Sequence, residues 1–267
     1  MGTFTNSDGV GLVYHGEAAD PLICLPGGPM QASSYLSGLP LRDVIRLDLR
    51  GTGESEKAGS YRVDHQVDDV EALRRHLGLE KLRLLGHSAG GTLAILYATR
   101  FPRHVEELVL VAPSPRVVGI EVTDDDRRAV AVQRSAEPWY AEAIEGFEQI
   151  WAGNFSGEAF AKIAPFHHGR WDDAARALED HPRNDEAAAE FYGEGAFDPA
   201  QVREELGKLD VPTVFLAGAY DVGLPANRAR EYAALIPGAR FELQPGAGHF
   251  PWVDDPRNFA ELLQRIP

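Results

Sequence analysis

Short, nearly continuous runs of apolar residues recur along the chain, and they predict strands that are buried on both faces. Such strands are typical of parallel sheets that helices cover on either side, because neither face is left in contact with water. A looser alternation over residues 3–15, around a turn-forming cluster at 6–9, predicts an antiparallel hairpin at the edge of the same sheet. The apolar runs span residues 22–25, 44–49, 82–85, 108–111 and 214–217, and residues 240–243 are also strand-like.

Between these runs, apolar residues recur at helical spacing, which predicts amphipathic helices. In the first of them Asp64 is a candidate N-cap, and Gly78 stands just past the end. The alternation of strands and helices predicts an α/β protein with a mostly parallel central sheet flanked by helices. The helices are expected over residues 64–77, directly after Ser88, over 225–235 and over 258–266.

One long segment interrupts this alternation, because residues 116–206 show successive helical patterns and no convincing strand. We interpret it as a helical cap inserted into a core that comprises residues 1–115 and 207–267. The clearest cap helix is predicted over 138–151. The cap holds three of the four tryptophans, Trp139, Trp151 and Trp171, which either pack within the cap or line a pocket between cap and sheet.

The composition and net charge of the protein disfavour some classes of binding partner. The chain has 267 residues and a formal net charge of −15, which argues against a nucleic acid or an anionic membrane surface as partner. In the cap, acidic residues outnumber basic ones about two to one, which indicates solvated helix faces or a site for a cationic group. Cys24 lies in an apolar run and is expected in the core.

Neither a secretory signal nor an apolar run of the ~20 residues that a membrane span needs is visible in the sequence. These observations predict a cytoplasmic protein that acts on a small molecule, with no membrane or nucleic-acid partner. Its state is expected to be a monomer or a homodimer.

The stretch Gly86-His87-Ser88-Ala89-Gly90 carries the strongest chemical signal. A Gly-x-Ser-x-Gly sequence between a buried strand and a helix predicts a nucleophile elbow, a strained turn that presents the serine hydroxyl at the top of a sheet. Glycines on both sides let neighbouring backbone pass close to the turn. Ser88 is therefore the candidate nucleophile.

A serine nucleophile needs a base and a group that orients the base. His249, in a glycine-containing loop between a predicted strand and the final helix, is the candidate base. Asp221 follows the strand-like run at 214–217, and the chain order Ser, Asp, His is the order expected of this elbow. A helix-capping role for Asp221 is the alternative, and Asp124 to Asp126 are the fallback carboxylates.

Other histidines and acidic residues are expected to have structural roles. His87 is interpreted as packing or pocket wall, because side chains of neighbouring residues leave a sharp turn in different directions. His167 and His168 are predicted at the surface, without metal-ligand spacing, and Asp48 is expected to stabilise its own turn.

The developing oxyanion needs hydrogen-bond donors, and these are expected from two backbone amides. One is the amide of Ala89, directly after the nucleophile. The other is expected in the loop Pro26-Gly27-Gly28-Pro29, which leaves the first parallel strand. Gly28 is the candidate donor there, with Gly27 as the alternative.

Taken together, these motifs resemble those of α/β-hydrolase-fold serine hydrolases, and within them the proline-iminopeptidase-like branch. Besides the elbow and the Pro-Gly-Gly-Pro loop, the turn at residues 48–55 and the surroundings of Asp221 and His249 are similar to that family, in order from about residue 22 to the C-terminus. Two positions depart from the usual His-Gly-Gly-Pro-Gly loop, where this chain has Pro26 and Met30. Ala89 also replaces the large residue that those enzymes tend to carry after the serine.

The resemblance implies an α/β-hydrolase fold and a serine hydrolase without cofactor or metal, which cleaves an ester or amide of a small, largely apolar substrate. It leaves an aminopeptidase open, because acidic cap residues hold the substrate's amino terminus in proline iminopeptidases. A non-hydrolytic lyase, cyclase or ligand-binding protein on the same fold is the alternative of another class. A dinucleotide-binding site is disfavoured, because Glu56 stands where the third glycine of Gly-x-Gly-x-x-Gly belongs. The pocket wall is expected from His87, Met30, Trp139 and Trp151.

Overall fold

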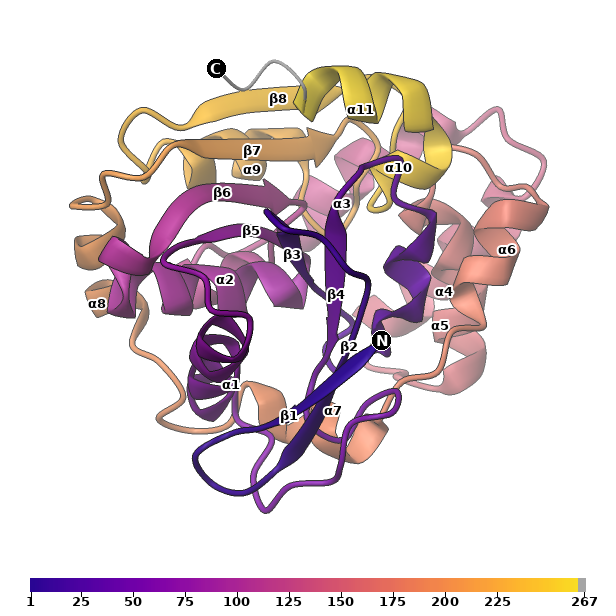
Figure 1. Cartoon of the computed structure of the whole chain (residues 1–267). Helices are drawn as coiled ribbons and strands as arrows, with labels where there is room; N and C mark the ends of the chain where they lie inside the picture. Colours follow the sequence, from indigo (N-terminus) through magenta and orange to yellow (C-terminus); the bar gives the residue numbers. More distant parts are fainter. Residues whose placement is uncertain (264–267) are drawn as a thin grey trace.

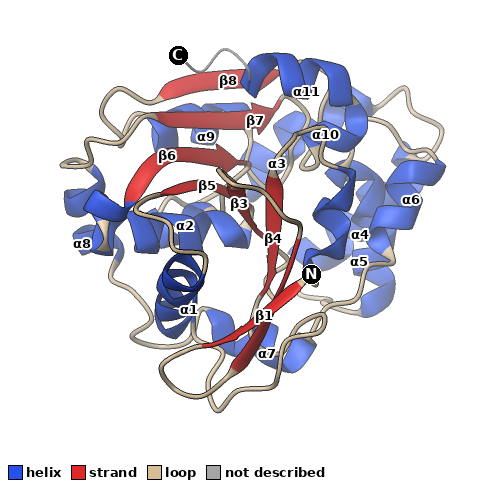
Figure 2. Ribbon diagram, viewed as in Figure 1, coloured by secondary structure: helices blue, strands red, loops and turns tan. Residues whose placement is uncertain are grey.

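In the computed structural model, which describes residues 1–263, eight strands form a single sheet with helices on both faces (Figures 1 and 2). Its strand order is β1-β2-β4-β3-β5-β6-β7-β8, and every pair from β4 to β8 is parallel. The predicted hairpin forms the antiparallel edge. The strands are β1 (Gly2–Thr5), β2 (Gly11–His15), β3 (Leu22–Leu25), β4 (Val44–Asp48), β5 (Leu82–His87), β6 (Val105–Val111), β7 (Thr213–Gly218) and β8 (Arg240–Gln244).

The apolar runs are continuous because successive residues of each inner strand enter two different cores. In β3, Ile23 and Leu25 belong to the larger cluster, whereas Leu22 and Cys24 belong to the smaller cluster on the opposite face. Side chains alternate across a strand, so a sheet that is covered on both sides needs an apolar residue at every position. The α/β class and the mostly parallel sheet are confirmed.

Helices α1 (Val63–His76), α2 (Ala89–Arg100) and α9 (Ala226–Ala233) contribute to the larger cluster, and α10 (Pro251–Asp254) and α11 (Pro256–Leu263) to the smaller one. Helix α11 starts two residues before the predicted helix, whose last positions lie outside the described residues. No helix within residues 1–263 combines the length and hydropathy of a membrane span.

Helix α1 begins and ends one residue earlier than the predicted 64–77. Asp64 is not the N-cap, because the helix starts at Val63 and the Asp64 carboxylate instead binds the Arg62 guanidinium at 2.9 and 3.0 Å. A carboxylate in the first turn is still favourable beside the positive helix end. At the other end Gly78 has a φ of 68°, and the amide of Leu79 reaches back to the Arg74 carbonyl, as in a Schellman motif.

Between β6 and β7 the regular elements of the described chain are helices and short 3₁₀ turns joined by loops, apart from one isolated bridge at Arg183. Helices α4, α5 and α6 lie together at one side of the sheet in Figure 1, whereas Phe191 of α7 and Leu206 of α8 belong to the larger sheet cluster. The division into core and cap therefore stays a prediction. The helices are α3 (Asp124–Ala131), α4 (Tyr140–Trp151), α5 (Gly157–Ile163), α6 (Asp173–Glu179), α7 (Asp185–Phe191) and α8 (Pro199–Leu206).

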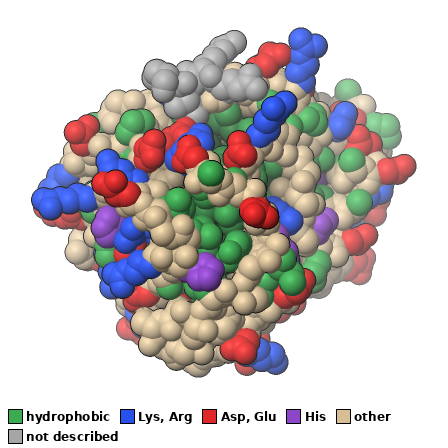
Figure 3. All heavy atoms as spheres, in the orientation of Figure 1, with side chains coloured by type: hydrophobic (Ala, Val, Ile, Leu, Met, Phe, Trp, Pro, Cys, Tyr) green, Lys and Arg blue, Asp and Glu red, His purple; other side chains and the backbone are tan. Residues whose placement is uncertain are grey.

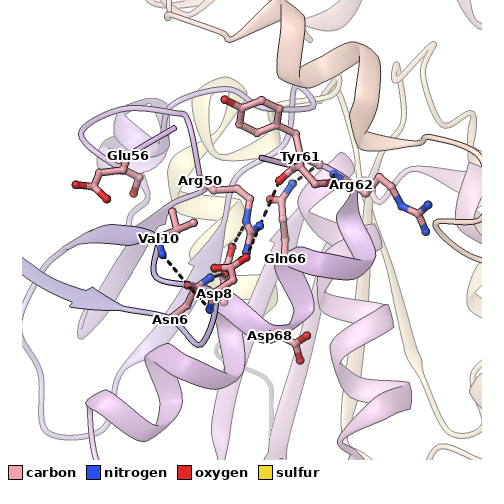
Figure 4. A network of polar contacts seen from close by, with 12 residues as sticks. Asn6, Asp8, Val10, Arg50, Glu56, Tyr61, Arg62, Gln66 and Asp68 are labelled. Carbon is pink, nitrogen blue, oxygen red and sulfur yellow. Dashed lines mark hydrogen bonds and ion pairs between the residues drawn. The ribbon is translucent and has the colours of Figure 1, made fainter. Parts of the chain in front are cut away.

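A network of polar contacts links the turn of the N-terminal hairpin to Arg50, which follows β4, and to α1 (Figure 4). Arg50, only 1% exposed, donates to both oxygens of Asp69 on α1, at 2.7 and 2.5 Å, and also binds Asp8 at 3.1 Å. The side-chain amide of Asn6 also donates to Asp69. On the outer surface, acidic and basic side chains are spread in mixed order over the face that carries this hairpin (Figure 3).

The order of the strands also locates a crevice. From β3 the chain moves outward to β4, and then returns to place β5 on the other side of β3. The loops that leave the carboxyl ends of β3 and β5 therefore diverge. In open α/β sheets such a switch point is where ligands bind.

Candidate active site

The turn after β5 has the geometry of a nucleophile elbow. Ser88 has φ 52° and ψ −119°, a conformation that costs a non-glycine residue about 1–3 kcal/mol. A Cβ atom at Gly90 would lie 2.1 Å from the Leu25 carbonyl oxygen, and one at Gly86 would lie 2.6 Å from the Gly90 carbonyl oxygen. Only glycine fits at either position, so the sharp turn and its packing against the end of β3 depend on both.

The structure brings His249 and Asp221 together from the ends of β8 and β7. His249 Nδ1 lies 2.8 Å from Asp221 Oδ2, while Asp221 Oδ1 accepts the amides of Gly223 at 2.7 Å and Leu224 at 3.1 Å. Asp221 is fully buried. It therefore binds the imidazole and shapes the turn before α9, but it does not cap that helix, whose N-cap is Pro225 without a side-chain hydrogen bond.

The charges of this pair are mutually stabilised. Burial raises the pKa of the Asp221 carboxyl, but the neighbouring imidazole and the hydrogen bonds from His249 and the two amides outweigh burial and lower it. Burial likewise lowers the pKa of His249, but the Asp221 charge and hydrogen bond outweigh it and raise it. Asp221 is thus an anion at neutral pH and favours the protonated imidazole that a general base becomes.

A cavity of about 560 Å³ joins the serine to this pair, with Ser88, His249 and Gly28 among its lining residues. Within residues 1–263 the Gly28 amide has no protein acceptor, and Ala89 is the first residue of α2, where an amide has no acceptor in the helix. The Gly27 amide, by contrast, donates to the Tyr35 hydroxyl at 2.7 Å. Of the two glycines that the sequence offered, Gly28 is the one with a free donor beside the cavity.

The opposite wall of the cavity comes from the segment around α6. It is fastened to both loops of the site, because the Ala32 amide donates to the Pro182 carbonyl at 3.0 Å and the His249 amide donates to the His167 carbonyl at 2.6 Å. Its side chains are mostly polar, unlike the apolar pocket expected from the sequence. They are His167, Leu178, Glu179, His181, Arg183 and Asp185.

The prediction that His167 and His168 lie at the surface is wrong for His168 and holds in part for His167, whose side chain is 34% exposed. His168 is completely buried and its Nε2 lies 2.7 Å from Glu179 Oε1, while His167 lines the cavity with Nδ1 3.6 Å from the same oxygen. Burial raises the pKa of Glu179, but the two neighbouring imidazoles, with the hydrogen bond to His168, outweigh burial and lower the pKa to about 2. The acidic partner is eleven residues away in sequence, so only folding reveals it.

Of the four residues expected in the pocket wall, one lines the cavity and three pack elsewhere. His87 lines the cavity. Met30 is fully buried in the larger core cluster beside Gln66, and Trp139 and Trp151 pack within the cap around Phe147 and Phe166. The two tryptophans therefore take the first of their two predicted roles, as core of the cap.

The fallback carboxylates and Asp48 have structural partners. Asp124 to Asp126 begin α3, where Asp126 forms a capping box with Thr123 and binds Arg228 at 2.9 Å. Asp48 accepts the amides of Ser33 and Glu54 and so stabilises its own turn, as expected.

Comparisons with known proteins agree with this architecture. The model of the alpha/beta hydrolase fold family matches residues 20–256. The chain is 28% identical over 280 residues to a putative 2-succinyl-6-hydroxy-2,4-cyclohexadiene-1-carboxylate synthase of Bacillus subtilis (strain 168), covering 100% of this chain and 98% of the relative. It is also 28% identical over 277 residues to a proline iminopeptidase of Lactobacillus delbrueckii subsp. lactis, covering 93% and 90%.

Among solved structures, the esterase EaEST from Exiguobacterium antarcticum matches with a TM-score of 0.69 and 18% identity, over 98% of this chain and 97% of the esterase. At that identity the match concerns the fold alone. The resemblance to proline iminopeptidases is confirmed by the curated relative, and the family model covers most of the chain. The chain belongs to the α/β-hydrolase fold family.

Proposed function

We propose that this chain is a serine hydrolase that cleaves an ester or amide bond through an acyl-enzyme, with no cofactor. The observation that carries the proposal is the hydrogen bond of 2.8 Å between His249 and the buried Asp221, at the edge of a cavity that Ser88 also lines. A strained serine, a buried carboxylate and an imidazole, in that chain order, are the parts of a catalytic triad.

In this mechanism His249 Nε2 takes the proton of the Ser88 hydroxyl as the oxygen attacks the substrate carbonyl carbon. The amides of Gly28 and Ala89 donate to the oxyanion, and Asp221 stabilises the imidazolium. His249 then returns the proton to the leaving alcohol or amine when the bond to the carbonyl breaks. A water molecule repeats the sequence on the acyl-enzyme and releases the acid.

The cavity supports a substrate that is small and carries polar groups, rather than a largely apolar one. Its volume is about 560 Å³, and Gln31, Glu179, His181 and Arg183 surround the space in front of Ser88. Burying an apolar chain against these groups would strip them of water without replacing their hydrogen bonds.

An aminopeptidase is the second candidate, because two carboxylates, Glu179 and Asp185, line the same cavity. The similarity to a proline iminopeptidase supports it. Glu179 is negatively charged at neutral pH and can attract an ammonium group, but it already binds His168. Asp185 is likewise paired, with Arg183 at 2.5 Å.

A two-part substrate panel tests the proposal: short-chain p-nitrophenyl esters and proline p-nitroanilide, with wild type and Ser88→Ala. We expect turnover of at least one class by wild type, and a kcat lower by about 10⁴–10⁶-fold in the variant. Equal turnover by both proteins would refute the proposal. Covalent labelling of Ser88 by a fluorophosphonate without turnover of either class would favour a non-hydrolytic reaction, the class that the name of the Bacillus relative indicates.

A further inference from the structure

Two buried side chains connect the oxyanion loop to the loop of His249. Tyr35 lies on the 3₁₀ helix η1 (Ser33–Gly38), and His87 is the last residue of β5. Each is 2% exposed. The Tyr35 oxygen lies 2.7 Å from the Gly27 amide nitrogen and 2.8 Å from His87 Nδ1, and His87 Nε2 lies 2.9 Å from the His249 carbonyl oxygen.

The Gly27 amide can only donate and the His249 carbonyl can only accept, and these two groups determine the direction of every hydrogen bond between them. A backbone carbonyl can only accept, so His87 Nε2 carries a proton and donates it to His249. Burial, with the nearby His249, lowers the pKa of His87 to about 3, so its ring is neutral and Nδ1 is an acceptor. The Tyr35 hydroxyl therefore donates to Nδ1, and its oxygen accepts the Gly27 amide.

The hydrogen-bond chain through Tyr35 and His87 contacts both the oxyanion loop and the loop of His249. At one end it occupies the Gly27 amide and so holds the loop in which Gly28 presents its free amide. At the other end it holds the carbonyl of His249, whose own amide is held by the His167 carbonyl at 2.6 Å. The backbone of the histidine is thus held on both sides, while Asp221 holds its ring.

We propose that Tyr35 and His87 are positioning residues, which keep the Gly28 amide and the His249 imidazole aligned on Ser88 through one buried hydrogen-bond chain. The proposal rests on the proposed function, since it assigns these residues a role in that reaction. Neither residue takes a proton from the substrate. Their effect is geometric, and a displacement of about 1 Å in a catalytic group can cost 10²-fold in rate.

The first test is the rate of Ser88 labelling by a fluorophosphonate, resolved into reagent binding and the maximal rate constant. Tyr35→Phe removes only the hydroxyl oxygen, and we expect the maximal rate constant to fall by about 10- to 100-fold with little change in reagent binding. Tyr97→Phe is the matched control, because the Tyr97 hydroxyl is equally buried and donates to Glu71 at 2.8 Å, away from the site. It should lower the melting temperature and leave the labelling rate unchanged.

Two substitutions of His87 separate the ends of the chain. The amide nitrogen of His87→Gln reaches about the place of Nε2 and can still donate to the His249 carbonyl, whereas the shorter side chain of His87→Asn cannot. We expect labelling to be slower in His87→Asn than in His87→Gln, in proteins whose circular dichroism matches wild type. Equal rates in both variants, or a wild-type rate in Tyr35→Phe, would overturn the proposal.

A second measurement does not depend on activity. Long-range ¹H–¹⁵N correlation of the imidazoles at pH 7 should show His87 as the neutral Nε2–H tautomer in wild type, and a shifted His249 resonance in Tyr35→Phe. A protonated or Nδ1–H ring at His87 would overturn the proposal. If the fluorophosphonate labelled wild type no faster than Ser88→Ala, the proposed function would be refuted instead. The tautomer of His87 would then still show whether the hydrogen-bond chain from Tyr35 to His249 exists.

Discussion

Replacing Asp221 by asparagine changes one atom of the fully buried side chain and should trap His249 in the wrong tautomer. Asp221 Oδ1 accepts two backbone amides, from Gly223 and Leu224, so an asparagine keeps its carbonyl oxygen at that place. Its NH₂ group then replaces Oδ2, 2.8 Å from His249 Nδ1. Because NH₂ can only donate, Nδ1 must accept and the ring proton moves to Nε2, which can no longer receive the serine proton.

The magnitude follows from two losses. The imidazolium loses a carboxylate at hydrogen-bond distance, worth about 4 kcal/mol at the effective dielectric constant of ~20 that suits such sites. The reactive tautomer also places two donors against each other in a buried site, at a cost of about 1–3 kcal/mol. Together they predict a loss of kcat of about 10⁴- to 10⁵-fold, which agrees with the ~10⁴-fold loss typical of this change in a triad.

The assay is kcat on whichever substrate class wild type turns over, with melting temperatures to verify folding. Asp126→Asn is the matched control, because Asp126 is a fallback carboxylate and its oxygen Oδ2 already accepts hydrogen bonds from Thr123 and Arg228. It should keep wild-type kcat. If Asp221→Asn retained activity within tenfold of wild type, or if Asp126→Asn lost it, the assignment of the orienting carboxylate would be refuted.

Three further predictions concern the ion pair, the pH dependence and the elbow. Arg50→Met should cost about 3–5 kcal/mol of unfolding free energy at pH 8, measured by urea denaturation, because it leaves the Asp69 carboxylate buried without its partner. Burial already raises the pKa of Asp69 despite Arg50, so the native variant takes up a proton as pH falls and the deficit should shrink at pH 5; a deficit that grew there would contradict this reasoning. The pH profile of kcat/KM should rise with a midpoint above the ordinary histidine value of about 6.5, since catalysis needs neutral His249 and its pKa is raised; a midpoint below 6 would argue against this base. Gly90→Ala should lower both the melting temperature and the rate of fluorophosphonate labelling, because its Cβ would lie 2.1 Å from the Leu25 carbonyl oxygen; a variant as stable and reactive as wild type would show that the elbow has room to relax.

The features that the sequence predicts correctly are those that depend on neighbours in the chain. Gly86, Ser88 and Gly90 lie within five residues of one another, so a local pattern predicts the elbow. Continuous apolar runs likewise predict strands that are buried on both faces. The position of Gly78 just past the end of α1 is also predicted from the residues beside it in sequence.

The features that the sequence misses depend on long-range pairing. The strip around residues 182–184 pairs with the backbone after the oxyanion loop, and this brings Glu179, His181 and Arg183 into the cavity. No local pattern distinguishes these residues from an exposed helix end. The positions of Trp139 and Trp151 could not be predicted either, because aromatic residues on short helices fit the core of a cap and the wall of a pocket equally well.

The most direct test of the central claim is a crystal structure of the protein after reaction with a fluorophosphonate. The account predicts a phosphonyl group on Ser88 Oγ, with its oxygen within hydrogen-bond distance of the Gly28 and Ala89 amides and His249 Nε2 facing the adduct. An adduct on another residue, or a phosphonyl oxygen bound by groups other than these two amides, would contradict it.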